Sequence, residues 1–160
     1  MKHSLRLFLL GCWACIASGV AFAADIAITT VGQSADGMMV KVLMKRLNRD
    51  PHYDAELNAR TLGAPKALIA VIGGSSKGLG AIGLSKEQEK ARARALLEAA
   101  RKTGIKVLVM HIGGDRRRGE LTDAFIEATA GLADRLIVVK SGNADAIFSR
   151  AKSPAALLTE

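Results

Sequence analysis

Residues 67–83 have the sequence ALIAVIGGSSKGLGAIG, in which six apolar residues run directly into a glycine-rich turn. A nearly continuous apolar run of this length is typical of a strand that is covered on both faces in a parallel sheet. Residues 105–110 and 136–139 have the same character, and a shorter apolar run lies at residues 26–28. With a weaker strand expected near residues 53–57, the chain contains about five strands.

Segments with helical periodicity separate these strands. In the first segment, Met39, Leu43 and Leu47 recur on one stripe, which we expect to face the sheet. In the second, Ser85 and Gln88 form a capping box that sets the start of the helix. Helices are expected over residues 37–49, 85–103 and 120–132, with one more after the last strand.

Strict alternation of strands and helices predicts an α/β fold, a three-layer sandwich of flavodoxin-like or Rossmann-like type with a mainly parallel sheet. The length of 160 residues allows a single domain, which we expect to span residues 24–160. With 49% hydrophobic residues, the chain is not of a disordered, collagen-like or coiled-coil type.

The first 23 residues have the pattern of a cleavable secretory signal peptide. Lys2 and Arg6 provide a positive start, residues 7–20 are almost entirely apolar, and residues 21–23 (AFA) form a cleavage site with small residues. We therefore expect an exported protein, either periplasmic or secreted. The apolar run is too short to favour an uncleaved membrane anchor.

Removal of this segment changes the chemistry of the chain. Two of the 23 basic residues and none of the 15 acidic residues leave, so the net charge falls from +8 to +6. Cys12 and Cys15 also leave, which excludes disulfides and thiolate metal sites. A lipoprotein anchor through Cys12 is disfavoured because too few apolar residues precede it. No later stretch is long enough to span a membrane.

Glycine-bearing loops follow the four apolar strands. In an open α/β sheet, ligands bind beyond the carboxyl ends of the strands, close to the point where the strand order reverses. Backbone N–H groups and basic side chains at this edge favour an anionic or polar ligand. The residues expected to bind it are Gln33, Ser34, Gly74, Ser75, Ser76, Lys77, Gly78, His111, Arg117, Arg118, Lys140 and Asn143.

Two enzyme motifs overlap in the glycine-rich turn. Residues 74–80 match a dehydrogenase glycine pattern, but no Tyr-x-x-x-Lys pair accompanies it, so nicotinamide binding is not expected. Residues 74–78 also match G-x-S-x-G, with Ser76 as a nucleophile and His111 and Asp115 as its available partners. A small serine-type hydrolase therefore remains an alternative.

Other ligand classes have less support. After processing, His52 and His111 are the remaining histidines and no metal-ligand spacing occurs, so neither a metal nor a cofactor is expected. A hard cation held by Asp36, Asp115 and Glu120 would be an unspecific arrangement. Nucleic acid is disfavoured because the basic residues of the second helix alternate with Glu87, Glu89 and Glu98, which is typical of a solvated face.

Four motifs in order resemble an exported bacterial family that is known only as a domain of unknown function. They are VGQSAD at residues 31–36, GGSSKGLGA at 73–81, HIGG-x-x-RRGEL at 111–121 and LIVVK-x-GN at 136–143. The resemblance implies a small exported α/β domain and no reaction, cofactor or catalytic residue. It also implies a further strand and helix after Phe148, where this chain has only a short tail.

The leading prediction is therefore a non-catalytic binding or accessory protein that holds a small anionic or polar ligand at the rim of the sheet. The alternatives are the hydrolase that uses Ser76 and His111, and a protein-interaction module of the cell envelope.

Overall fold

A parallel sheet forms the centre of the computed structural model, which describes residues 24–151 and 157–159. The strand order is β2-β1-β3-β4-β5-β6, and each neighbouring pair is parallel. The first five strands follow the flavodoxin-like order, so the expected α/β sandwich is confirmed. The strands are β1 (Ile26–Val31), β2 (His52–Tyr53), β3 (Ala67–Ile72), β4 (Lys106–His111), β5 (Arg135–Val138) and β6 (Leu157–Thr159).

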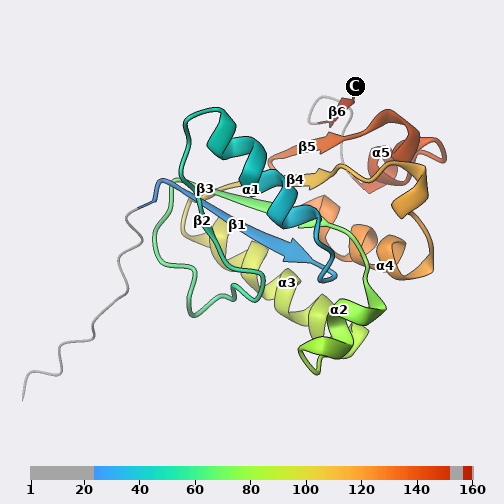
Figure 1. The fold of residues 1–160 in the computed structure, drawn as a ribbon, viewed down its shortest axis with the longest axis horizontal. Coiled ribbons are helices and arrows are strands. Elements are labelled where there is room, and N and C mark those ends of the chain that lie inside the picture. Colours follow the sequence, from blue (N-terminus) through green and yellow to red (C-terminus); the bar gives the residue numbers. More distant parts are fainter. Residues whose placement is uncertain (1–23, 152–156, 160) are drawn as a thin grey trace, which may run out of the picture.

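Helices cover the two faces of this sheet unequally. Helix α1 packs on one face through Val40 and Met44, whereas α3, α4 and α5 contribute buried residues to the opposite face (Figure 1). The helices are α1 (Asp36–Arg46), α2 (Ser76–Ala81), α3 (Lys86–Lys102), α4 (Glu120–Thr129) and α5 (Ile147–Ala151), with short 3-10 turns η1 (Asp115–Arg117), η2 (Ala130–Leu132) and η3 (Lys140–Asn143).

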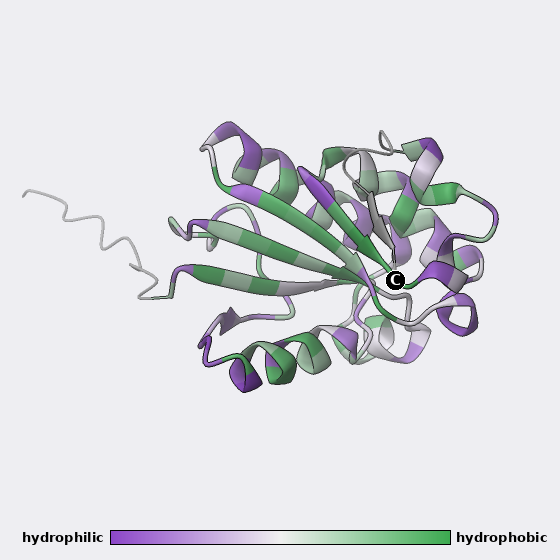
Figure 2. Ribbon diagram, turned by 90° about the horizontal axis from the view of Figure 1, so that it is seen from above, coloured by the Kyte–Doolittle hydropathy of each residue, from purple (hydrophilic) through white to green (hydrophobic). Residues whose placement is uncertain are grey.

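The larger core lies on the face covered by α3, α4 and α5. Leu96, Leu97, Phe125 and Phe148 are fully buried there against apolar strand residues. The central strands are apolar along most of their length (Figure 2). This pattern is the one expected for strands that are covered on both faces.

The expected orientation of α1 is wrong. The side chains of Met39, Leu43 and Leu47 are 54%, 48% and 70% exposed, and the helix instead turns Gly37 and Val40 towards the sheet. Gly37 lies there because a Cβ atom at this position would meet the side chain of Thr30 on β1. Close approach of helix to strand therefore selects the face with the small residue, although the other stripe is more apolar.

The glycine-rich turn also differs from expectation, because residues 76–81 form the short helix α2 rather than a loop. The side chain of Ser75 caps this helix by accepting a hydrogen bond from the amide of Gly78 over 3.0 Å. The capping box of Ser85 and Gln88 at the start of α3 is confirmed.

Two expectations concern the ends of the chain. The signal peptide predicted for residues 1–23 lies outside the described residues. At the other end, β6 extends the sheet beyond β5 by parallel pairing. Among the described residues, no helix has both the length and the apolar character needed to cross a bilayer.

Candidate functional site

The strand order reverses between β1 and β3, and the loops that follow these two strands close onto each other. Gln33 and Gly74 form an antiparallel bridge, and the amide of Ser34 donates to the carbonyl oxygen of Gly73 over 3.2 Å. Backbone pairing therefore occupies the point of reversal, where the sequence predicts a ligand.

A buried carboxylate holds the loop after β1. Glu89 on α3 is fully buried, and its carboxylate accepts hydrogen bonds from the amide of Gly32 over 2.9 Å and from Nε2 of Gln33 over 3.2 Å. Arg92 lies one turn later and donates to the same carboxylate over 2.7 and 2.8 Å. The expectation that Glu89 belongs to a solvated helix face is therefore wrong, because its carboxylate pairs with buried donors.

This network also supports a strained backbone. Gln33 has a φ of 60°, which is in the left-handed region that a non-glycine residue rarely adopts. Its side-chain amide donates to the carbonyl oxygen of Ala55 over 3.0 Å as well as to Glu89. Gln33 was expected to bind ligand, but its side chain is used to hold the loop.

Several other expected ligand-binding residues make structural hydrogen bonds. The amide of Gly74 donates to the hydroxyl of Thr122 over 3.0 Å, and the buried hydroxyl of Ser34 accepts from the amide of Asp36 over 3.3 Å. Asn143 accepts from the amide of Phe148 over 3.0 Å at the start of α5. These hydrogen bonds therefore stabilise the loops at the rim of the sheet.

His111, the last residue of β4, is fully buried. Its Nδ1 lies 3.1 Å from the carbonyl oxygen of Ile72, its Nε2 lies 3.0 Å from that of Gly114, and its ring stacks on Phe148. Both ring nitrogens therefore already face backbone acceptors. Ser76 is exposed at the start of α2, and no hydrogen bond joins it to His111 within the described part of the chain.

Arg118 joins the loop after β4 to the segment after β5. Its guanidinium donates to Asp123 over 2.6 and 3.1 Å, to Asp145 over 3.0 and 2.9 Å, and to the carbonyl oxygen of Gly142 over 2.5 Å. These hydrogen bonds lower the pKa of Asp123 and bring the pKa of Asp145 to about 2, and they raise the pKa of Arg118. The charge of Arg118 is thus neutralised within the protein.

Lys77, Arg117 and Lys140 differ from Arg118, because their exposed side chains form no ion pair within residues 24–151. The loops that carry Arg117 and Lys140 lie side by side, since the amide of Asp115 donates to the hydroxyl of Ser141 over 3.3 Å. All the strands are parallel, so Lys77 after β3 lies at the same edge of the sheet. This edge therefore retains positive charge that could attract an anion.

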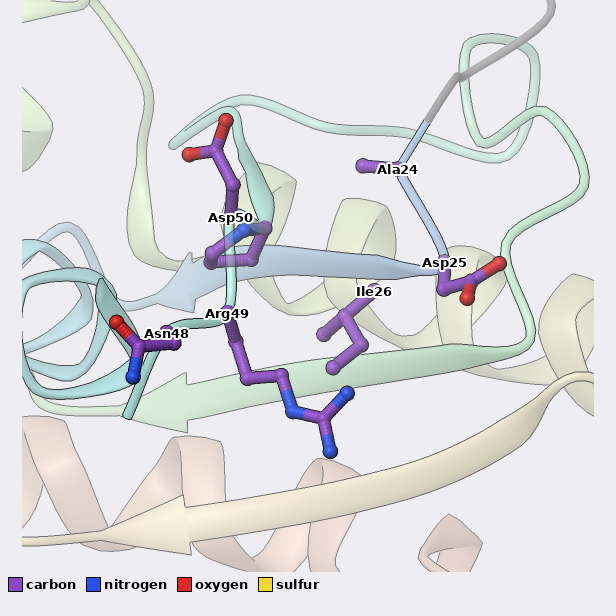
Figure 3. A pocket seen from close by; sticks show the side chains of 7 residues that line it. Ala24, Asp25, Ile26, Asn48, Arg49 and Asp50 are labelled. Carbon is purple, nitrogen blue, oxygen red and sulfur yellow. The ribbon is translucent and has the colours of Figure 1, made fainter. Parts of the chain in front are cut away.

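Three clefts of the described residues lie away from this edge. One, of about 270 Å³, lies beside the amino end of β1 and is lined by residues 24–26 and 48–51 (Figure 3). A second lies between α3 and α4. The third, of about 410 Å³, lies along α1 and is lined by Ala35, Met38, Met39, Val42, Leu43 and Arg46.

The third cleft lies along the side of α1 that is turned away from the sheet, opposite Gly37 and Val40. Tyr53 of β2 lies beside Gly37, and Lys41 is placed over its ring at 5.5 Å. At 3.6 residues per turn, Leu43 and Leu47 lie on the flank of α1 away from β2, with Met39 beside them. The lining of this cleft is apolar apart from Arg46.

The sheet beside this flank of α1 is incompletely covered. Val71 of β3, Met110 of β4 and Ile137 of β5 stand in one row. Val71 is fully buried under α1, whereas Met110 and Ile137 are half-buried. We call this surface the α1 groove: its wall is Met39, Leu43 and Leu47 on α1, and its floor is Leu108, Met110, Ile112, Ile137 and Val139.

The sequence prediction missed the α1 groove, although one signal was present. Residues 38–44 contain large apolar side chains at every position except Lys41, so apolar residues surround most of the helix. A helix that is apolar nearly all round is typically covered on more than one side. The pattern therefore indicated a second contact surface on α1.

No metal centre is evident in the part of the chain that the structure describes, because no three His, Cys, Asp or Glu side chains gather there in a suitable cluster. Asp36 has a buried oxygen, Oδ2, without a hydrogen-bond partner. This atom lies beside Gly73 and the hydroxyl of Ser34.

Comparisons with known proteins identify a family without assigning an activity. No curated protein matches this chain, and neither does any solved structure. One family model, described as a domain of unknown function (DUF6305), matches residues 23–157. The match covers all the strands and helices from β1 to α5, so the chain belongs to the DUF6305 family.

Proposed function

We propose that this protein is a non-catalytic binding protein that acts as a protein-interaction module, with the α1 groove as its docking surface. The observation that carries the proposal is the clustering of exposed large apolar side chains. Met38, Met39, Val42, Leu43 and Leu47 lie on one helix, and Val139 lies on the floor of the groove. Exposed apolar residues are ordinary when scattered, whereas a contiguous cluster marks an interaction site.

Site-specific photo-crosslinking in the native cell tests this proposal. A benzophenone amino acid at Leu43 is expected to give a discrete cross-linked protein. The same group at Ala95, an exposed position on α3, is the matched control because it lies on the other face of the sheet. If Leu43 and Ala95 give the same products, or if neither gives any, the α1 groove is not a docking surface.

A second candidate function is the binding of a small anion at the carboxyl edge of the sheet. The charges of Lys77, Arg117 and Lys140, which have no ion-pair partner among the described residues, favour it, whereas the nearby Arg118 is paired with two carboxylates. Inorganic phosphate and citrate are expected to raise the melting temperature of the protein, and Arg117→Ala is expected to reduce this effect. An equal shift in the variant, or no shift at all, would remove this candidate.

The hydrolase alternative has less support, because both ring nitrogens of His111 face backbone carbonyl groups. A general base needs a free nitrogen within hydrogen-bond reach of the nucleophile. Hydrolysis of a generic ester that is lost in Ser76→Ala would restore this alternative.

We also propose that the protein acts outside the cytoplasm after removal of residues 1–23, in the periplasm or the medium. The positive start, the apolar run and the AFA sequence at residues 21–23 support this proposal. Sequencing of the amino terminus of the protein from its native cell is expected to begin at Ala24.

A further inference from the structure

The α1 groove has the dimensions of a missing helix. Helix α1 contacts β1, β2 and β3, so it covers one half of its face of the sheet. A second helix packed beside it would lie about 8–10 Å away. That distance equals about two strand spacings of 4.8 Å, which places the second helix above β4 and β5. Among residues 24–151 and 157–159, no helix packs there.

The floor of the groove presents apolar side chains of β4 and β5 to such a helix. On β4, Val107 and Val109 point into the core on the α3 side, so Leu108 and Met110 point to the α1 side. Ile137 and Val139 follow the same alternation along β5. The six residues of β4 extend about 20 Å at 3.3 Å per residue, a length that a helix of about 13 residues spans.

Positive charge surrounds one end of the groove. Arg46 is exposed near the end of α1, and Arg49 extends away from Asp50 (Figure 3). Lys106 begins β4 and points to the α1 side by strand alternation.

The acidic groups at the same end are already engaged. Asp25 pairs with Lys66 at 3.0 Å, and Asp50 pairs with Lys45 at 3.5 Å. Asp134 accepts a hydrogen bond from the amide of Val107 over 2.8 Å. The amino end of the groove is therefore complementary to negative charge.

We infer that the occupant of the α1 groove is an acidic amphipathic helix of a partner protein, which supplies the missing helix of the sandwich. The inference rests on the proposed function and adds the chemistry of the partner. The apolar stripe of the partner helix packs on the floor and on Met39 and Leu43. Its Asp or Glu side chains lie near Arg46 and Arg49.

Two other occupants fit less well. A second copy of this chain would present the same positive charge, so self-association gains no charge complementarity. A flat lipid surface would rest on α1, which stands above the sheet by about the 10 Å of a packed layer, and would not reach the floor. A helix both enters the recess and brings the opposite charge.

Peptide binding to the mature protein tests the inference. The probe is a fluorescent synthetic helix of about 13 residues with leucines on one stripe and glutamates elsewhere. The control peptide has lysine in place of each glutamate. In fluorescence anisotropy at low ionic strength, the acidic peptide is expected to bind at least about tenfold more tightly than the basic one.

Charge reversal then locates the site. The double variant Arg46→Glu/Arg49→Glu is expected to lose affinity for the acidic peptide and to gain affinity for the basic peptide. The matched control Arg94→Glu, on α3, is expected to keep the preference of the original protein. An acidic peptide that does not bind, or a preference that the double variant leaves unchanged, would overturn the inference.

The crosslink at Leu43 separates this inference from the proposed function. If the cross-linked partner segment is an acidic helix, both stand. If the segment has another chemistry, the docking surface stands and the acidic helix is wrong. A dimer in sedimentation equilibrium that Leu43→Lys abolishes, or co-sedimentation with phosphatidylglycerol vesicles that it abolishes, would replace the partner helix by a second copy or a lipid surface.

Discussion

Replacement of Arg92 by methionine is expected to destabilise the protein strongly, because it leaves a buried carboxylate without its ion-pair partner. Glu89 is fully buried, and Arg92 holds its carboxylate at 2.7 Å with 12% of the arginine side chain exposed. Methionine preserves much of the apolar stem of the arginine and removes the charge. The substitution also leaves the backbone carbonyl oxygens of Leu57 and Thr30 without the hydrogen bonds that Arg92 donates to them.

The magnitude follows from the burial of the pair. Removal of one partner of a buried ion pair costs about 3–5 kcal/mol. Glu89 keeps two other donors, the amide of Gly32 and the side chain of Gln33, so a loss of about 3 kcal/mol is expected. The pair of Arg94 and Glu98 lies on the same helix at 2.8 Å, but its side chains are 60% and 51% exposed. Arg94→Met should therefore cost only about 0.5 kcal/mol.

Urea unfolding, followed by circular dichroism, measures both free energies. An unchanged slope with a lower midpoint shows that stability, and not the unfolded state, has changed. Glu89→Gln combined with Arg92→Met should be more stable than Arg92→Met alone, because the unpaired charge is removed. If Arg92→Met and Arg94→Met lower stability by the same amount, the buried network does not hold the loop after β1.

Two further predictions concern the rim and its glycines. Because Arg118 lowers the pKa of Asp123 and Asp145 below the usual value of 3.8, the two ion pairs stabilise the folded state above about pH 4. This contribution is lost as the pH falls from about 4 to 2, so Arg118→Met should flatten the loss of stability in acid titrations followed by circular dichroism; an equally steep loss in the variant would contradict the assignment. Gly78→Ala should lower the free energy of unfolding by about 1–3 kcal/mol, because its methyl group would collide with the carbonyl oxygen of Gln33. Gly80→Ala, in the same helix with open space around it, should be neutral or raise it by up to about 1 kcal/mol in urea unfolding, and equal effects at the two positions would refute the proposed close approach.

Most of the fold could be predicted from local sequence patterns. The apolar run at residues 67–72 predicts a strand that is covered on both faces, and the structure places it as β3 in the middle of the sheet. The capping box of Ser85 and Gln88 predicts the start of α3. Such signals can be found in sequence because the groups that cause them lie within a few residues of each other.

The candidate site could be predicted only in part. The parallel topology brings the expected loops to one edge of the sheet, but it does not determine how each side chain is used. Arg117 and Arg118 are adjacent in sequence and equally basic, yet Arg118 is paired with two carboxylates from other segments. Glu89 resembles its exposed neighbour Glu87, and only the approach of the loop after β1 explains its burial.

The order and type of the main strands and of the longer helices follow from the amino-acid sequence alone, because hydrophobic periodicity and capping act over short distances along the chain. The flank of α1 that faces the sheet is set by a tertiary contact. That choice depends on the close approach of Gly37 to Thr30 on β1, a contact between separate elements that no local pattern contains. It leaves Met39 and Leu43 exposed, and these side chains form part of the wall of the α1 groove.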